Sequence, residues 1–108
     1  MENKLLLGKL EIIKKAILNK VDAKYIYLFG SNAYGEPNEN SDIDIYAVIP
    51  DNFDKNILIT TGEIYRNIAN ENIFFVDLVL VKENNFIEHR DYSFEKMIVN
   101  EGVLLYAS

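Results

Sequence analysis

The chain contains no cysteine and no long apolar run. Without cysteine, neither a disulfide framework nor a thiolate zinc site can form. No apolar stretch approaches the roughly 18 residues that a membrane-spanning helix requires. The first segment, MENKLLLGKLEIIKK, has too many charges and too short an apolar stretch for a signal peptide. We therefore expect a soluble, cytoplasmic protein with no membrane contact.

Positive charge is also scarce. Eleven lysines and arginines stand against 17 aspartates and glutamates, which gives a formal net charge of −6. Non-specific nucleic-acid binding depends on lysine and arginine neutralising phosphates, so DNA and RNA are unfavourable partners. The length of 108 residues is typical of one domain, and the sequence shows no linker, repeat or low-complexity tract. We expect a single domain spanning residues 1–108.

The first third of the chain predicts a helix followed by a strand. Apolar residues recur at three- and four-residue steps, as in an amphipathic helix of about 15–18 residues: Leu6, Leu10, Ile13, Ile17 and Val21. The segment KYIYLF is β-branched and aromatic, and it predicts a short buried strand that stops at Gly30. SNAYG allows only a single helical turn, and EPNENS is loop-like.

Two further strands carry the charged residues of interest. DIDIYAVI alternates strictly, with Asp42 and Asp44 on one face, and predicts a strand that ends at Pro50. Residues 54–70 have helical spacing. IFFVDLVLV is the strongest strand, because apolar residues fill both of its faces, and this favours a central or doubly covered position. Its one charged residue is Asp77.

The remaining third predicts a loop, a helix and a last strand. KENNFIEHRD is loop-like, whereas YSFEKMIVNEG predicts a helix with Gly102 at its C-terminal cap. VLLYA predicts a final short strand. The predicted order is α-β-loop-β-α-β-α-β. This order is typical of a mixed α/β (α+β) domain with helices packed on a small sheet of about four strands.

Three aspartates are the candidate catalytic and metal-binding residues. Asp42 and Asp44 are two residues apart on a strand, so both carboxylates project from one face, roughly 7 Å apart along the backbone. Asp77 lies in an otherwise apolar strand, where an unpaired carboxylate would cost several kcal/mol. If the two strands are neighbours, about 4.8 Å apart, all three carboxylates can converge. Such a cluster, with no lysine or arginine nearby, favours two Mg²⁺ or Mn²⁺ ions about 3.5–4 Å apart.

Gly30 and Ser31 are the candidate nucleotide-binding residues. A glycine at a strand end allows close backbone approach, and the amides and hydroxyl that follow it can hold an anion. An anion beside two magnesium ions is most simply a triphosphate. The Gly-Ser turn and the aspartates would then bind the same nucleotide.

Other interpretations of the same segments are weaker. Residues 30–37 have the glycine spacing of a P-loop, but a glutamate and a proline occupy the places where lysine and serine or threonine are needed. Residues 40–51 imitate the start of a calcium loop, but an isoleucine replaces the required glycine. We expect the only histidine, His89, to be a surface loop residue and not a catalytic base. We expect Tyr34 to be a packed turn aromatic that does not stack on a nucleobase.

The segment GSNAYGEPNENSDIDIYAV resembles the signature of the nucleotidyltransferase superfamily (DNA polymerase β-like), with Gly-Ser and Asp-x-Asp separated by ten residues. FVDLVLV supplies a third carboxylate where that family has it. The short length and the ending MIVNEGVLLYAS are most similar to the minimal nucleotidyltransferases, which are often antitoxins paired with HEPN-domain toxins. The resemblance covers nearly the whole chain. It implies the nucleotidyltransferase fold.

The resemblance also implies a role for each candidate residue. Gly30 and Ser31 would contact the triphosphate. Asp42 and Asp44 would ligate both metal ions, and Asp77 would ligate one of them and activate the acceptor hydroxyl. The expected reaction is transfer of a nucleotide, by resemblance AMP from ATP, to a hydroxyl, with two Mg²⁺ ions, or Mn²⁺, as cofactors.

The chain has no second domain to hold the base or the acceptor, so we expect part of the substrate site to come from a second copy or a partner. By resemblance the partner is a HEPN toxin and the acceptor one of its tyrosines. Many minimal members have arginines in the turn after Gly-Ser, where this chain has Asn32 and Tyr34. The alternative is therefore a non-catalytic antitoxin that neutralises its partner by binding, with a vestigial metal site. Transfer to an aminoglycoside-like molecule is disfavoured, because such enzymes usually carry an additional helical domain.

Overall fold

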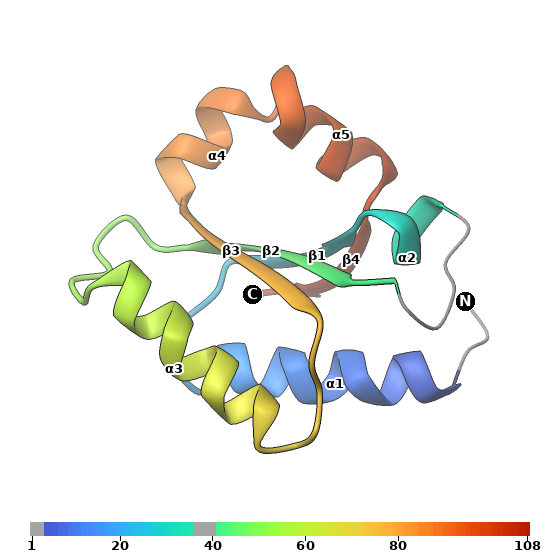
Figure 1. Cartoon of the computed structure of the whole chain (residues 1–108). Coiled ribbons are helices and arrows are strands. Elements are labelled where there is room, and N and C mark those ends of the chain that lie inside the picture. Colours follow the sequence, from blue (N-terminus) through green and yellow to red (C-terminus); the bar gives the residue numbers. More distant parts are fainter. Residues whose placement is uncertain (1–3, 36–40) are drawn as a thin grey trace.

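A computed structural model describes residues 4–35 and 41–108 of the chain (Figure 1). In these residues the elements are α1 (Lys4–Leu18), β1 (Tyr25–Phe29), α2 (Ser31–Tyr34), β2 (Ile43–Ile49), α3 (Ile57–Ala69), β3 (Val76–Lys82), α4 (Glu83–His89), α5 (Ser93–Glu101) and β4 (Val103–Ala107). Most of the predicted loop EPNENS, residues 36–40, lies outside the described residues. None of the described helices combines the length and the apolar character that crossing a membrane requires.

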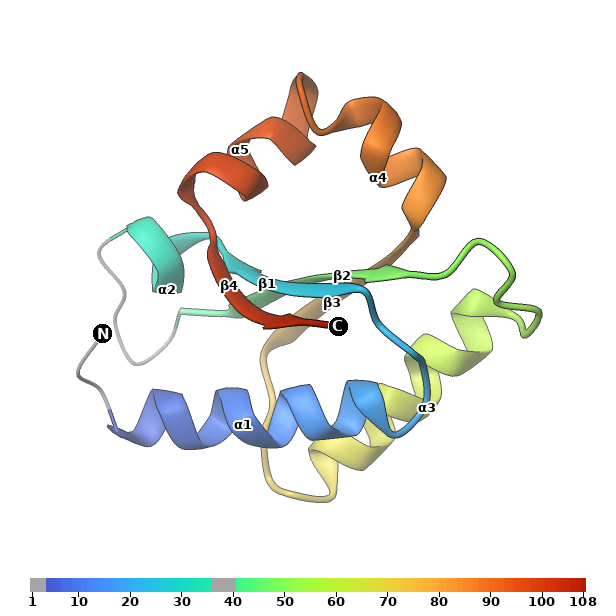
Figure 2. The ribbon, with the colours of Figure 1, turned by 180° about the vertical axis from the view of Figure 1, so that it is seen from behind.

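The strands form one mixed sheet in the order β3-β2-β1-β4. β2 pairs with β3 in parallel, whereas β1 pairs with β2 and with β4 in antiparallel fashion. α1 and α3 cover one face of the sheet and α4 and α5 the other (Figure 1). Figure 2 shows the same layers from behind, with α1 running below the sheet. This arrangement confirms the predicted α+β class with a four-stranded sheet.

The alternation of β2 separates two apolar clusters, one on each face of the sheet. Ile43, Ile45 and Ile49 join the larger cluster with the buried residues of α1 and α3. Tyr46 and Val48 join the smaller one, with Tyr27, Phe86 and Ile98 from β1, α4 and α5. Because side chains alternate along a strand, Asp44 shares the face of Tyr46, on the side covered by α4 and α5.

β3 is an edge strand of the described sheet, so its predicted central position is wrong. Its burial alternates: Val76, Leu78 and Leu80 are buried, whereas Asp77 and Val79 are exposed. In the sequence, apolar residues occupy both faces of this strand. In the structure, the face that carries Asp77 and Val79 is exposed to solvent. The backbone N–H of Leu78 donates to the Tyr65 hydroxyl of α3 at 2.7 Å, which satisfies a donor at this edge.

The segment KENNFIEHRD was predicted as a loop, but it contains helix α4. The Asp51 carboxylate accepts a hydrogen bond from the Asn84 N–H at 2.9 Å and so satisfies a free amide of the first turn. Phe86 anchors the helix: it is 2% exposed and its ring lies 5.9 Å from that of Tyr25 and 6.0 Å from that of Tyr46. Both contacts join residues far apart in sequence, so local spacing could not predict them.

Gly102 ends α5, as the sequence predicts, but not through a left-handed backbone. Its φ is −73°, and its N–H donates to the Ile98 carbonyl at 2.9 Å. A Cβ at this position would lie 2.5 Å from the Ile98 oxygen and 3.0 Å from the Leu28 oxygen. Glycine is therefore needed for close packing between the end of α5 and β1.

Candidate active site

The candidate carboxylates lie at one end of the parallel strand pair. Asp44 and Asp77 are each the second residue of their strand, and they are Cα partners in the register of β2 and β3. The two strands are therefore neighbours, which is the condition under which these carboxylates can approach one another. Asp42 lies one residue before β2 and is exposed, so it was wrongly included in the strand.

Asp44 and Asp77 are directly coupled. Burial raises the pKa of Asp44 from its ordinary 3.8 to about 6, aided by a side-chain hydrogen bond with Asp77 and by the charges of Asp77 and Asp42. No described lysine or arginine forms an ion pair with Asp44 or Asp77. Two carboxyl groups held together without a cation repel one another when both are ionised. A proton on Asp44 relieves that repulsion below about pH 6.

Gly30 connects this pair to the end of β1. Its φ of 75° lies in the left-handed region, which residues with a side chain rarely adopt. A Cβ on Gly30 would overlap the Asp44 Oδ2 atom. The glycine therefore allows the turn to lie directly against the acidic pair.

The turn that follows Gly30 is α2, which confirms the predicted single helical turn. The amides of Ala33 and Tyr34 donate to the Gly30 carbonyl at 3.0 and 3.2 Å. Asn32 donates from its side chain to the Asp42 carbonyl at 2.6 Å and so fixes the backbone just before β2. The Ser31 hydroxyl makes no hydrogen bond with any residue in the described ranges, which leaves it able to bind a ligand.

Tyr34 belongs to α2 and His89 to α4. The Tyr34 hydroxyl donates to the Met97 sulfur at 3.5 Å, which links α2 to α5, although the side chain is exposed. His89 is the last residue of α4 and so is not in a loop as predicted. Its Nδ1 lies 2.7 Å from the Asn85 carbonyl oxygen, and its ring lies 5.5 Å from that of Tyr92.

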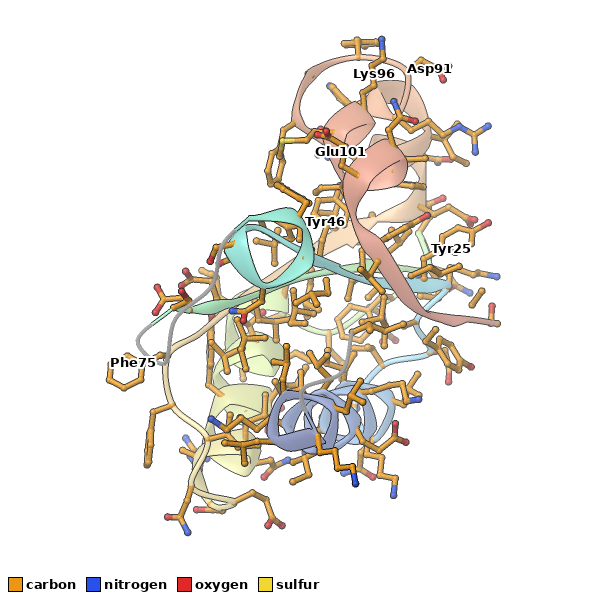
Figure 3. All side chains as sticks on the ribbon, turned by 90° about the vertical axis from the view of Figure 1, so that its right-hand side faces the viewer. Tyr25, Tyr46, Phe75, Asp91, Lys96 and Glu101 are labelled. Carbon is orange, nitrogen blue, oxygen red and sulfur yellow. The ribbon has the colours of Figure 1, made fainter. Side chains whose placement is uncertain are left out.

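Several residues around the site were not predicted from the sequence. Tyr46 donates to the Glu95 carboxylate of α5 at 2.9 Å, and burial together with this bond raises the pKa of Tyr46. In Figure 3 Tyr46 lies between the sheet and α5. Phe94, next to Glu95, packs edge-on against Phe29 at 5.2 Å. In the sequence, the only indication of these contacts was the aromatic residue Phe94 at the start of α5.

The donor chemistry of the site fits a divalent metal ion. Asp44 and Asp77 provide neighbouring hard oxygen ligands with no competing cation among the described residues. In the parts of the chain that the structure describes, however, no three ligand side chains are gathered closely enough to form a complete metal site. The Asp44–Asp77 pair is assembled, and Asp42 is near enough to raise the pKa of Asp44 by repulsion.

The chain belongs to the polymerase beta nucleotidyltransferase family, because the model of the family "Polymerase beta, Nucleotidyltransferase" matches residues 11–108. No curated protein matches the chain by sequence. A crystal structure of a Sulfolobus solfataricus protein, assigned as a nucleotidyltransferase, has a TM-score of 0.56 and 24% identity, over 99% of this chain and 90% of that one. These findings confirm the predicted nucleotidyltransferase fold.

Solved toxin–antitoxin pairs are also similar to this chain. One, a toxin–antitoxin with AMP-PNP, has a TM-score of 0.60 and 25% identity over 91% of this chain and 73% of that one. Another is a tri-AMPylated Shewanella oneidensis HEPN toxin in complex with an MNT antitoxin. It has a TM-score of 0.52 and 23% identity over 95% of this chain and 72% of that one. These structures share the fold of this chain.

Proposed function

We propose that this chain is a minimal nucleotidyltransferase that acts as an antitoxin. It would transfer AMP from ATP to a tyrosine hydroxyl of a HEPN toxin, in the cytoplasm where ATP is available. The observation that carries the proposal is the pairing of Asp44 with Asp77 in the parallel register, next to Gly30, whose backbone lies against the Asp44 carboxylate. The similar solved pairs, one with AMP-PNP and one with an AMPylated HEPN toxin, support the choice of nucleotide and partner.

The role proposed for each residue is the one that the resemblance to the family implies. The acceptor oxygen forms a bond to the α-phosphorus while the bond from phosphorus to pyrophosphate breaks, and pyrophosphate leaves. Asp77 is exposed, so its carboxylate can take the proton of the incoming hydroxyl. Two Mg²⁺ ions, or Mn²⁺, held by Asp42, Asp44 and Asp77, would stabilise the attacking and leaving oxygens. Gly30 and Ser31 would bind the phosphates through the backbone and the hydroxyl.

The charge of the site is consistent with these roles. The pKa of Asp44 is about 6, so most molecules carry the ionised form at neutral pH. A divalent cation would displace the remaining proton and neutralise the repulsion within the pair. The acidic pair thus favours the metal ions that the reaction needs.

Asp77→Asn tests the enzyme directly. The substitution keeps volume and removes the base, so nucleotide transfer should fall by at least about 10²-fold. The measurement is the intact mass of the HEPN toxin co-expressed with each version of the chain. Asp54→Asn, in the exposed loop after the other end of β2, is the matched control and should leave the AMP adduct unchanged.

A non-catalytic antitoxin is the second candidate, and one observation favours it. Residues 25–54, which contain the Gly-Ser turn and two of the aspartates, include no lysine, arginine or histidine. A triphosphate at this end of the sheet would receive little positive charge from the chain itself. For this candidate, Asp77→Asn should protect cells as well as the parent does, with no adduct on the toxin from either version.

A further inference from the structure

Exposed apolar side chains border the proposed active site on the β3 side. Phe74 and Phe75 directly precede β3 and are 59% and 76% exposed. Val79 is 40% exposed and lies two residues after Asp77, on the same face of the strand. Neighbouring exposed apolar side chains mark an interaction site more often than isolated ones do.

A fourth apolar side chain borders the site on the β1 side. Phe94 of α5 is 43% exposed, and its ring packs against Phe29 at 5.2 Å. Phe29 is the register partner of Asp44 in the β1–β2 pair. The acidic pair therefore lies between Phe94 on one side and the Phe74–Phe75 segment on the other.

Phe75 has an unusual backbone conformation although its side chain is exposed. Its φ is 61°, a left-handed value that is rare for a bulky residue. The Ile43 N–H donates to the Phe75 carbonyl at 2.9 Å and fixes this backbone beside the start of β2. Figure 3 shows the ring projecting away from the body of the protein. A strained residue with an exposed aromatic ring is typical of a binding site.

The charge of this region indicates the chemistry of what binds it. Residues 67–81, which include Phe74 and Phe75, contain no lysine or arginine, and the same is true of residues 25–54. Asp42 and Asp77 are exposed among the apolar side chains. A protein surface with an apolar cleft bordered by lysines or arginines complements this arrangement. Those cations would also lie next to the phosphates of a bound nucleotide, where residues 25–54 and 67–81 offer none.

We propose that Phe74, Phe75, Val79 and Phe94 form an acceptor-docking surface. It receives the partner protein that presents its hydroxyl to Asp77, and Phe75 is the main anchor in an apolar, basic-rimmed cleft of that partner. This inference rests on the proposed function, because it names the surface through which that function's partner reaches the site. The partner would complete the active site by supplying the positive charge.

Phe75→Ala tests this surface. The probe is the HEPN toxin of the co-expression experiment, purified separately and titrated by calorimetry. Phe75→Ala should weaken binding by at least about tenfold, the range of an aromatic anchor. Leu58→Ala is the matched control, since Leu58 is 83% exposed on α3, on the other face of the sheet, and it should leave the affinity unchanged. Binding by the parent chain should also weaken as salt is raised.

A second variant and the remaining outcomes keep the inference distinct from the proposed function. Phe75→Leu retains an apolar anchor and should recover most of the affinity. Unchanged affinity in Phe75→Ala, or no binding by the parent chain, overturns the docking surface. The docking surface is also overturned if Phe75→Ala weakens only Mg-ATP binding, which indicates base stacking, or only self-association, which indicates a second copy. If Phe75→Ala loses binding while the parent complex gives no AMP adduct, docking stands and the transfer reaction is refuted.

Discussion

The backbone of Gly30 lies against the carboxylate of Asp44, so that no side chain can be accommodated at position 30. The two residues come from antiparallel neighbours, since Phe29 is the register partner of Asp44. The position of the turn and the orientation of the acid are therefore set by the same contact. A change at either residue should disturb the other.

Gly30→Ala should destabilise the protein and displace Asp44. A residue with a Cβ in the left-handed region costs roughly 1–2 kcal/mol, and the overlap with Asp44 adds to this. Urea or thermal unfolding measures the loss, which should lower the melting temperature by several degrees. Gly62→Ala is the control. Gly62 lies within α3 with open space where a Cβ would project, so that substitution should raise stability by about 0.5–1 kcal/mol.

Stability should depend on pH through Asp44. The pKa of Asp44 is about 6 in the folded protein against an ordinary 3.8, so between these values the folded state keeps a proton that the unfolded state has lost. The contribution of Asp44 to stability should therefore decrease as pH rises from about 4 to about 6 and then level off. Urea unfolding should be measured across this range, with a chelator present, for the parent chain and for Asp44→Asn. The difference between their free energies of unfolding, parent minus variant, should show that slope. A flat difference would show that folding does not raise the pKa of Asp44.

Divalent metal ions should stabilise the folded chain. Binding to the acidic cluster at millimolar Mg²⁺ or Mn²⁺ raises the melting temperature by mass action. The double variant Asp42→Asn, Asp44→Asn removes two ligands and the repulsion, so it should be slightly more stable without metal and should lose the metal response. Asp54→Asn serves as the exposed control. A metal response that survives in the double variant would place the site elsewhere.

Phe86→Ala should cost more stability than the same change at its neighbour. Phe86 fills the cluster between the sheet and α4, so its removal should lower the free energy of unfolding by about 3–5 kcal/mol. Ile87 lies on the same helix but is exposed, and Ile87→Ala should change that free energy by less than about 0.5 kcal/mol. Equal effects of the two substitutions in chemical denaturation would mean that α4 is not anchored through Phe86.

Apolar periodicity was enough to predict most of the fold. The helix at Lys4–Leu18 and the strands at Ile43–Ile49 and Val103–Ala107 follow from local spacing, which responds to burial on one face or both. The α4 helix was missed because its stability comes from Asp51 and the aromatic cluster, both distant in sequence. The edge position of β3 was missed because strand order is decided by packing across the whole sheet.

Part of the candidate site could also be predicted from the sequence. Asp44 and Asp77 were recognisable because each is a charge in an apolar strand, and their pairing followed once the strands were assumed to be neighbours. Asp42, by contrast, lies just outside the strand, and its position depends on a turn fixed by Asn32. The exposure of Phe75 could not be predicted, since two adjacent phenylalanines before an apolar strand are usually part of its core.

The hydrogen bond from the Leu78 N–H to the Tyr65 hydroxyl affects how copies of the chain associate at high concentration. An uncovered strand edge can recruit a strand from another molecule and so begin aggregation. At Leu78 the donor that an incoming strand would need is already engaged by a side chain from α3. Tyr65 thus makes this edge a poor template for added strands. The Leu78 amide should also exchange slowly with solvent deuterium, although it belongs to the outermost strand.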